Sequence, residues 1–307
     1  MFIRKLSAVI GALVLGALAA FPAAGQQTKI VLGYTTAADF VPAFAAKDKG
    51  LFEKRHLDVT LLRIALASNV PSVLVSGSVQ IGMGTAPAFL QAAEGGLDLV
   101  AICGASRFKK ENPMSSLVAR AGLKIENAGD LRGKKVGVPG LNSFFDVVFR
   151  KWLLNNKVAL NQVSFVETPF PQMRDLLKGG TIDAVLAIEP FRTRIVGDNT
   201  GYKVADVVSE VHPDLLGAFW MATRDWAKAN AGAIKAFREA YAEAIAWSLQ
   251  NAAEAKALEA KYLGVAGPVV PSYSTEVKAA DLEFYASVGK EIGALRQPVN
   301  ANKLIWK

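Results

Sequence analysis

The sequence has very few of the residues that most often perform chemistry. Its 307 residues include one Cys and two His. A single Cys cannot form an internal disulfide, and the sequence contains no CxxC, HxxxH or GxSxG pattern. His56 lies in a predicted polar turn and His212 in a predicted loop before Pro213, each without a neighbouring residue that would indicate catalysis. We therefore expect no enzymatic activity, no catalytic residue, no metal site and no cofactor.

Charged residues and long apolar runs are also scarce. Asp, Glu, Lys and Arg make up 20% of the chain and hydrophobic residues 51%, which excludes a disordered or nucleic-acid-coating protein and indicates a packed globular one. The formal net charge is +8, but basic residues stand in short separate groups such as Lys134-Lys135, so no nucleic-acid partner is predicted. After residue 25 no uninterrupted apolar run reaches the roughly 18 residues of a membrane span, so we predict none in the mature chain.

The first 25 residues have the order of a secretory signal peptide. Arg4 and Lys5 precede an uncharged apolar run over residues 6–21, and small residues stand at positions 23–25 before Gln26. The run is too short for a comfortable membrane span, and an uncleaved N-terminal anchor is the alternative. We predict cleavage near Gly25/Gln26 and export to the periplasm. The mature chain then carries a net charge of +6.

The rest of the chain alternates apolar segments with helical patterns in two successive sets. Strands are predicted at 30–34, 57–63, 80–83, 98–103, 134–138, 162–167 and 184–188. Helical patterns lie between them, and Cys103 is expected to be a small core residue. After a strand at 216–223, helices are predicted at 225–251 with a break near Asn230, at 252–263 and at 279–292. Alternating strands and helices predict an α/β fold whose mainly parallel sheets are covered by helices.

Six short motifs occur in a defined order over residues 29–263. They are Lys49-Gly50-Leu51-Phe52, Leu57-Asp58-Val59, Gly77-Ser78-Val79-Gln80-Ile81-Gly82, Asp130-Leu131-Arg132-Gly133-Lys134-Lys135-Val136-Gly137-Val138, Gly180-Thr181-Ile182-Asp183-Ala184 and Glu189-Pro190. In this order the series resembles the ABC-importer solute-binding proteins for alkanesulfonates, taurine, nitrate and thiamine-pyrimidine precursors.

This resemblance implies a two-lobed, type II periplasmic binding protein fold in which the chain crosses between the lobes twice. Lobe 1 would hold residues 26–112 and 217–307, and lobe 2 residues 113–216. The implied function is the periplasmic solute-binding component of an ABC importer. It would close on a small solute by hinge motion and deliver it to a membrane permease with its ATPase, and we expect a monomer. The alternatives are an exported sensor for a membrane receptor and an enzyme like those that make the thiamine pyrimidine, whose Cys-rich iron-binding motif this chain lacks.

The solute site is expected where helices begin beyond the carboxyl ends of strands, because ligands bind there in open α/β sheets. Five loops qualify, and Trp220 lies on a strand near them. The predicted ligand-binding residues are Thr35, Thr36, Asp39, Phe40, Asn69, Thr85, Ala86, Asn142, Ser143, Phe144, Glu189 and Trp220.

Several of these side chains have a second interpretation. Asp39, Asn69, Thr85 and Ser143 could instead cap helices. Asn142-Ser143 is the favoured site, since the resemblance implies that hydroxyl and backbone N–H groups of this loop bind an acidic group of the ligand.

The Glu189 carboxylate has two possible roles. The aromatic residues indicate the kind of solute. Glu189 could accept hydrogen bonds from an amine or ring nitrogen of a ligand, or pair with Arg192 or Arg194. The aromatic residues near the expected cleft favour an organic solute, which we expect to be anionic, sulfonate-like or aromatic.

Overall fold

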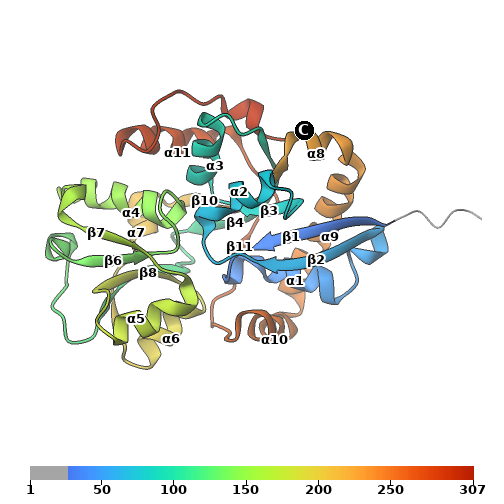
Figure 1. Ribbon diagram of the computed structural model, residues 1–307. Helices are drawn as coiled ribbons and strands as arrows, with labels where there is room; N and C mark the ends of the chain where they lie inside the picture. Colours follow the sequence, from blue (N-terminus) through green and yellow to red (C-terminus); the bar gives the residue numbers. More distant parts are fainter. Residues whose placement is uncertain (1–26) are drawn as a thin grey trace, which may run out of the picture.

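The computed structural model describes residues 27–307, which form two α/β lobes side by side (Figure 1). Each lobe is built on its own sheet, of six strands in the first and five in the second. The predicted two-lobed α/β fold is confirmed. The predicted signal peptide lies outside the described residues.

The first sheet has the strand order β11-β4-β10-β3-β1-β2. Its strands are β1 (Thr28–Tyr34), β2 (Leu57–Arg63), β3 (Ile81–Gly84), β4 (Leu99–Lys109), β10 (Asp214–Thr223) and β11 (Ser272–Tyr273). One face is covered by α1 (Val41–Asp48), α9 (Ala231–Gln250) and α10 (Ala252–Leu263), and the other by α2 (Val70–Val75), α3 (Ala86–Glu94) and α11 (Ala279–Glu291) (Figure 1). Helix α8 (Arg224–Ala229) precedes α9, and the break between them falls at Asn230 as predicted.

The second sheet has the strand order β7-β6-β8-β5-β9. Its strands are β5 (Ser115–Arg120), β6 (Lys135–Val138), β7 (Ser164–Glu167), β8 (Ala184–Ile188) and β9 (Gly201–Ala205). Helices α4 (Phe144–Asn155) and α7 (Val207–Val211) pack together on one face, and α5 (Met173–Lys178) and α6 (Phe191–Gly197) on the other (Figure 1).

Both sheets are mixed, whereas the sequence pattern predicts mainly parallel ones. Strands β1, β2 and β3 run parallel, as do β6, β7 and β8. Strands β10 and β11 run antiparallel to their neighbours in the first sheet, and β5 does so to β8 and β9 in the second. Strands β5 and β10 each follow a strand of the other sheet, so neither belongs to a β-α-β unit within one sheet, the unit that makes neighbouring strands parallel.

The chain crosses between the lobes twice, and the two crossings lie side by side. Residues 110–114 join β4 to β5, and residues 206–213 join β9 to β10. Lys110 N–H donates a hydrogen bond of 2.8 Å to Pro213 C=O, which links the two segments. Strand β10 begins at Asp214, so residues 214–216 lie in the first sheet. The exact bounds of the lobes stay a prediction.

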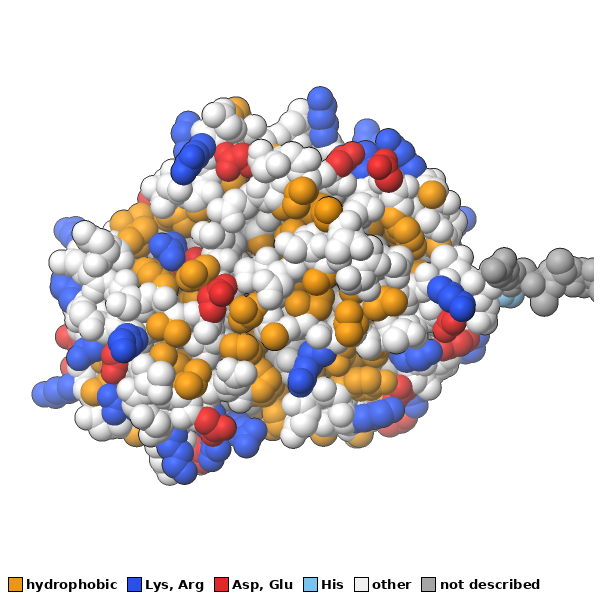
Figure 2. Space-filling model, viewed as in Figure 1, with side chains coloured by type: hydrophobic (Ala, Val, Ile, Leu, Met, Phe, Trp, Pro, Cys, Tyr) orange, Lys and Arg blue, Asp and Glu red, His pale blue; other side chains and the backbone are white. Residues whose placement is uncertain are grey.

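The lobes are in contact along one boundary. Phe108 of β4 stacks on Phe144 of α4 with ring centres 4.6 Å apart. Backbone N–H groups of the first lobe reach the second, from Ala38 to Glu189 C=O at 3.4 Å and from Ala67 to Pro139 C=O at 3.3 Å. Figure 2 shows hydrophobic side chains gathered in the middle of this face and charged ones mostly around them. The structure therefore has the lobes closed on each other.

Residues 274–276 pack closely against Gly104 of β4. A Cβ added at Gly104 would lie 2.5 Å from both Ser274 O and Glu276 O, too close for backbone atoms to accommodate. We expect Gly104→Ala to lower the free energy of unfolding by about 1–3 kcal/mol, measured by urea denaturation.

Gly232 in α9 supplies the matched control. A Cβ there meets no other atom of the described chain within 4 Å, so Gly232→Ala should raise stability by about 0.5–1 kcal/mol through helix propensity. Equal stability of the two variants would contradict the packing described for β4.

Candidate functional site

The loop after β1 carries a buried carboxylate. It forms a short 3-10 helix, Ala38–Phe40, at the carboxyl end of the strand. Thr35 and Thr36 are buried here, and Asp39 is 4% exposed. Asp39 Oδ1 accepts no hydrogen bond from any residue in 27–307. The proposed capping role of Asp39 is therefore not observed at this oxygen, and the N-cap position of α1 is held by Phe40.

Three further buried polar atoms lie in the region of Asp39. They are Ser106 Oγ of β4, Trp220 Nε1 of β10 and Tyr241 Oη of α9, and within the described chain none of them has a partner at hydrogen-bonding geometry. Ser106 lies close enough to Asp39 to lower the pKa of its carboxyl, and Trp220 lies close enough to Tyr241 to lower the pKa of its hydroxyl. We call Asp39, Ser106, Trp220 and Tyr241 the Asp39 cluster.

The electrostatics of the Asp39 cluster follow from burial. Loss of hydration raises the pKa of Asp39 to about 7, and the Ser106 hydroxyl opposes this only in part. The pKa of Tyr241 and that of Tyr273 in β11 are raised well above their ordinary value, mainly by burial and further by the charge of Asp39. Each buried polar atom without a partner costs about 1–3 kcal/mol, and native proteins rarely leave several together. The Asp39 cluster therefore gathers several buried hydrogen-bonding atoms that have no partner within residues 27–307.

Thr85 adds a fifth such atom at the carboxyl end of β3. It occupies the N-cap position of α3, but its side chain makes no capping bond, and Thr85 Oγ1 is buried without a partner in the described structure. Ala86, which follows, is fully buried. The capping alternative for Thr85 is therefore wrong, and its hydroxyl is available at the same edge of the first sheet.

The Asn142-Ser143 loop of the second lobe uses its polar groups internally. Ser143 Oγ donates a hydrogen bond of 2.6 Å to Gly140 C=O, so it does not cap α4. Asn142 has φ +57, and its N–H donates to Asp146 Oδ2 at 2.7 Å. Ligand binding by Asn142 and Ser143 stays a prediction.

Asn69 and Asn142 meet in a separate surface groove. Within residues 27–307, Asn69 is exposed and forms no capping bond at α2. The groove has a volume of about 620 Å³ and lies on the α2 and α3 side, with Ser68, Gln91, Leu141 and Glu167 also in its wall. Trp220 instead packs against Phe237 and Tyr241 of α9, on the other side of the first sheet. The predicted site residues are therefore divided between two places.

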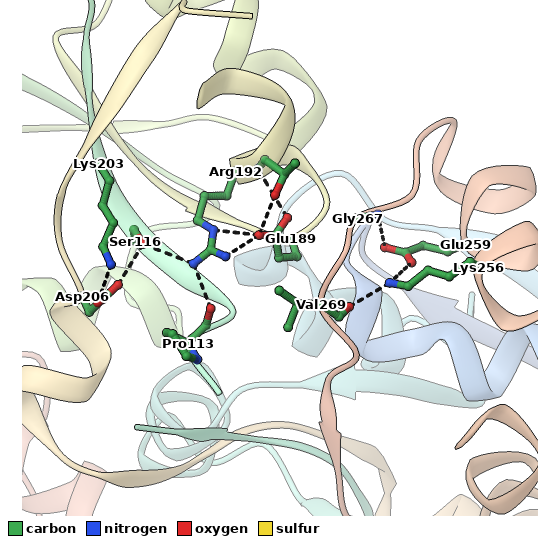
Figure 3. Close-up of polar contacts among 11 residues, drawn as sticks. Pro113, Ser116, Glu189, Arg192, Lys203, Asp206, Lys256, Glu259, Gly267 and Val269 are labelled. Atoms are coloured by element: carbon green, nitrogen blue, oxygen red, sulfur yellow. Dashed lines mark hydrogen bonds and ion pairs between the residues drawn. The ribbon is translucent and has the colours of Figure 1, made fainter. Parts of the chain in front are cut away.

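Glu189 forms an ion pair with Arg192, which is the second of its two predicted roles (Figure 3). Its side chain is fully buried, and Oε1 accepts hydrogen bonds from Arg192 Nε at 2.7 Å and from Thr193 Oγ1 at 2.9 Å. Arg192 also donates to Pro113 C=O, on the first crossing between the lobes. Because the Glu189 C=O accepts from Ala38, this residue holds the second lobe next to Asp39.

A loop between α10 and β11 faces Glu189 from the first lobe (Figure 3). A Cβ added at Gly267 would lie 3.0 Å from Glu189 Oε2, so the two segments are in close contact. Buried Glu259 accepts from Lys256 Nζ at 2.8 Å and from Gly267 N–H at 3.2 Å, which fixes the loop. Burial raises the pKa of Glu259, opposed by Lys256, and the nearby charge of Glu189 raises it further.

The aromatic residues predicted to line a cleft are packed instead. Phe40 and Trp220 meet edge to face at 5.3 Å within the first lobe, and Phe144 stacks on Phe108 where the lobes meet. All three of the predicted residues are at most 2% exposed. Their role as walls of a solute site stays a prediction.

Sequence reasoning missed Ser106, Tyr241 and Tyr273. The predicted strand 98–103 stops short of Ser106, whereas β4 continues to Lys109. Tyr241 lies at helical spacing from the other apolar residues of α9, a position typical of a core residue. Only Tyr273 had a local signal, since it lies in the Gly/Pro/Ser-rich turn between two predicted helices.

Comparisons with known proteins assign the chain to a family. A family model described as the NMT1-like family matches residues 23–263. The chain belongs to the NMT1-like family. Among solved structures, this NMT1-like chain resembles the alkanesulfonate-binding protein SsuA of Xanthomonas axonopodis bound to MOPS. The TM-score is 0.79 at 17% identity, over 92% of this chain and 99% of that one. The nitrate-binding protein NrtA of Synechocystis matches with a TM-score of 0.77 at 17% identity, over 91% of this chain and 86% of that one.

Curated relatives point the same way. The nitrate/nitrite binding protein NrtA of Nostoc is 26% identical over 240 residues, which span 72% of this chain and 54% of the relative. A Haemophilus influenzae protein named for thiamine biosynthesis is 26% identical over 174 residues, which span 56% of this chain and 54% of that one. The chain thus spans about half the length of these two relatives. The homologues of this NMT1-like chain include periplasmic solute-binding proteins of ABC importers.

The described residues lack two further features. No helix within 27–307 is long and apolar enough to cross a membrane. The same residues hold no group of three or more His, Cys, Asp or Glu side chains placed to bind a metal ion.

Burial of Asp39 predicts a pH-dependent cost to stability. The folded protein holds the Asp39 proton up to about pH 7, whereas the unfolded chain releases it near 3.8, so stability falls as pH rises through this window. Asparagine cannot ionise, so the stability advantage of Asp39→Asn over the wild type should grow by about 2 kcal/mol between pH 5.5 and pH 8. Urea unfolding of the ligand-free proteins at both pH values measures it.

Asp58→Asn is the control for this titration. Asp58 lies at the start of β2, the end of the sheet opposite to Asp39, and is partly exposed. Asp39→Asn should differ from this control in how strongly the effect on stability changes with pH. A pH-independent effect of Asp39→Asn would contradict the raised pKa.

Proposed function

We propose that this chain is the solute-binding component of an ABC importer. It captures a small organic solute between its lobes in the periplasm, after removal of residues 1–25, and delivers it as a monomer to a membrane permease. Membership of the NMT1-like family and the periplasmic binding proteins among its homologues support this proposal. The observation that carries it is the Asp39 cluster, whose buried polar atoms lack partners in the described chain beside the boundary where the lobes close.

Closure supplies the mechanism. The paired crossings, linked between Lys110 and Pro213, form a narrow connection about which the lobes can rotate. In an open form, water can reach the edge of the Asp39 cluster that faces the second lobe, whereas Ser106, Trp220 and Tyr241 of the first lobe still surround Asp39. Closure removes that water, so the closed form is favoured when a solute replaces the lost hydrogen bonds. The permease would then recognise the surface formed by the two closed lobes.

Native mass spectrometry of the protein, exported with its own leader and purified from the periplasm, tests this function. We expect a chain that begins at Gln26 and a bound small molecule that is released chemically unchanged on unfolding. Small-angle scattering should show a larger radius of gyration once the solute is removed. A solute that returns chemically altered would contradict a pure binding role.

A surface contact between the lobes allows a graded test of closure. Ser68 Oγ of the first lobe donates to Glu167 Oε1 of the second at 3.0 Å, and Leu141 N–H donates to the same oxygen at 2.8 Å. Because the contact is exposed, Ser68→Ala should weaken solute binding by about two- to fivefold in calorimetry, with an unchanged melting temperature.

Ser72→Ala, on the exposed face of α2, is the matched control and should leave affinity unchanged. If both substitutions have the same effect on affinity, closure does not involve the contact between Ser68 and Glu167.

A further inference from the structure

We propose that Asp39 binds a positively charged nitrogen of the solute, so that this protein carries a cationic organic compound with an apolar or aromatic part. The proposal rests on the solute-binding function proposed above and names the class of its ligand. It departs from the anionic solute that the family resemblance suggests.

The first argument is the mismatch between burial and partners at Asp39. Its side chain is only 4% exposed, and within residues 27–307 no cationic side chain forms an ion pair or hydrogen bond with it. A buried carboxylate must be neutralised by a proton or paired with a cation. The proton serves in the empty protein, since burial raises the pKa of Asp39 to about 7. A cationic nitrogen in the closed site would take its place.

The second argument is that the neighbouring arginines are already used. Arg192 pairs with Glu189, and Arg107 pairs with Asp214 and Asp281. Arg238 donates to the carbonyl groups of Ile102 and Trp306. An anionic solute in the Asp39 cluster would therefore meet a buried carboxylate, which is unfavourable at low dielectric. Arg63, opposite Tyr34 at the end of β2, makes no ion pair within residues 27–307, but it is exposed, so water and salt screen its attraction.

The third argument is the pattern of the remaining groups. Trp220 Nε1 can only donate a hydrogen bond, while the hydroxyls of Ser106 and Tyr241 can donate or accept. Phe40 packs on Trp220 and supplies apolar surface beside them. The cluster thus combines one anionic acceptor, one fixed donor and an aromatic surface. A ring compound with a protonated nitrogen and one acceptor atom satisfies all three.

A panel of small molecules in four arms tests the charge of the solute by thermal shift at pH 8. The arms are arylalkyl amines and amidines, alkane- and arylsulfonates, nitrate, and neutral aromatic amides. We expect a raised melting temperature in the amine and amidine arm and none with sulfonates or nitrate. Asp39→Asn should weaken binding of the best cationic compound at least tenfold in calorimetry, while Asp58→Asn should leave it unchanged.

Proton release gives a readout that a merely structural role of Asp39 would not produce. Among the groups near the site, burial raises the pKa of Tyr241 and of Tyr273 well above 10 and that of Cys103 to about 12. Burial also raises the pKa of Glu259, but its ion pair with Lys256 opposes this. Asp39 is therefore the group expected to titrate near pH 7. Calorimetry at pH 7 in two buffers of different ionisation enthalpy should show release of about half a proton per cation bound, and affinity should be higher at pH 8 than at pH 5.5.

The outcomes separate this proposal from the function beneath it. If sulfonates or nitrate raise the melting temperature and compact the protein while the amines and amidines do not, the binding function stands and the cationic class is wrong. If a cation binds with equal affinity to Asp39→Asn and to the wild type, Asp39 is not its acceptor. If no arm raises the melting temperature and the purified protein holds no small molecule, both proposals fail.

Discussion

The structure depends on one constraint, which is that the chain passes between its two sheets at a single place. Both crossings lie together, joined by the hydrogen bond from Lys110 to Pro213, and Arg192 ties the first crossing to Glu189. A connection of this kind resists separation of the lobes but permits rotation. The segments around Asp39, Ser68 and Gly267 lie where the two lobes meet, so they come together or part when the lobes rotate.

Closure of the lobes is therefore coupled to the burial of Asp39. The Ala38 N–H that contacts the second lobe is adjacent to Asp39, so the same movement that brings the lobes together removes water from the carboxylate. Removal of water disfavours the charged form and strengthens any interaction with an opposite charge. A site of this kind is unstable when closed and empty, and a matching solute stabilises it. Selectivity and closure then come from the same buried groups.

Much of the architecture could be predicted because its signals are local. Strands β2 and β8 and helix α10 have the predicted bounds, since each is an apolar or amphipathic run ended by glycine or by a polar turn. The antiparallel direction of β5 and β10 and the existence of β11 could not be predicted, because the strands with which they pair are distant in sequence. The site divides similarly. Asp39 and Thr85 follow strands as expected, whereas Ser106 and Tyr241 join them only through the pairing of β4 and the packing of α9.

The net charge of the protein does not determine which ions a buried site binds. The chain is basic overall, which by itself would favour anionic partners through the general field. That field acts through water and salt, where charges more than about 10 Å apart are largely screened at 0.1 M ionic strength. A buried carboxylate acts at contact distance in a medium of low dielectric constant, and one such interaction outweighs several exposed lysines. In the proposed site, the sign of the bound ion is therefore set by the side chain in the loop after β1, not by the net charge of the chain.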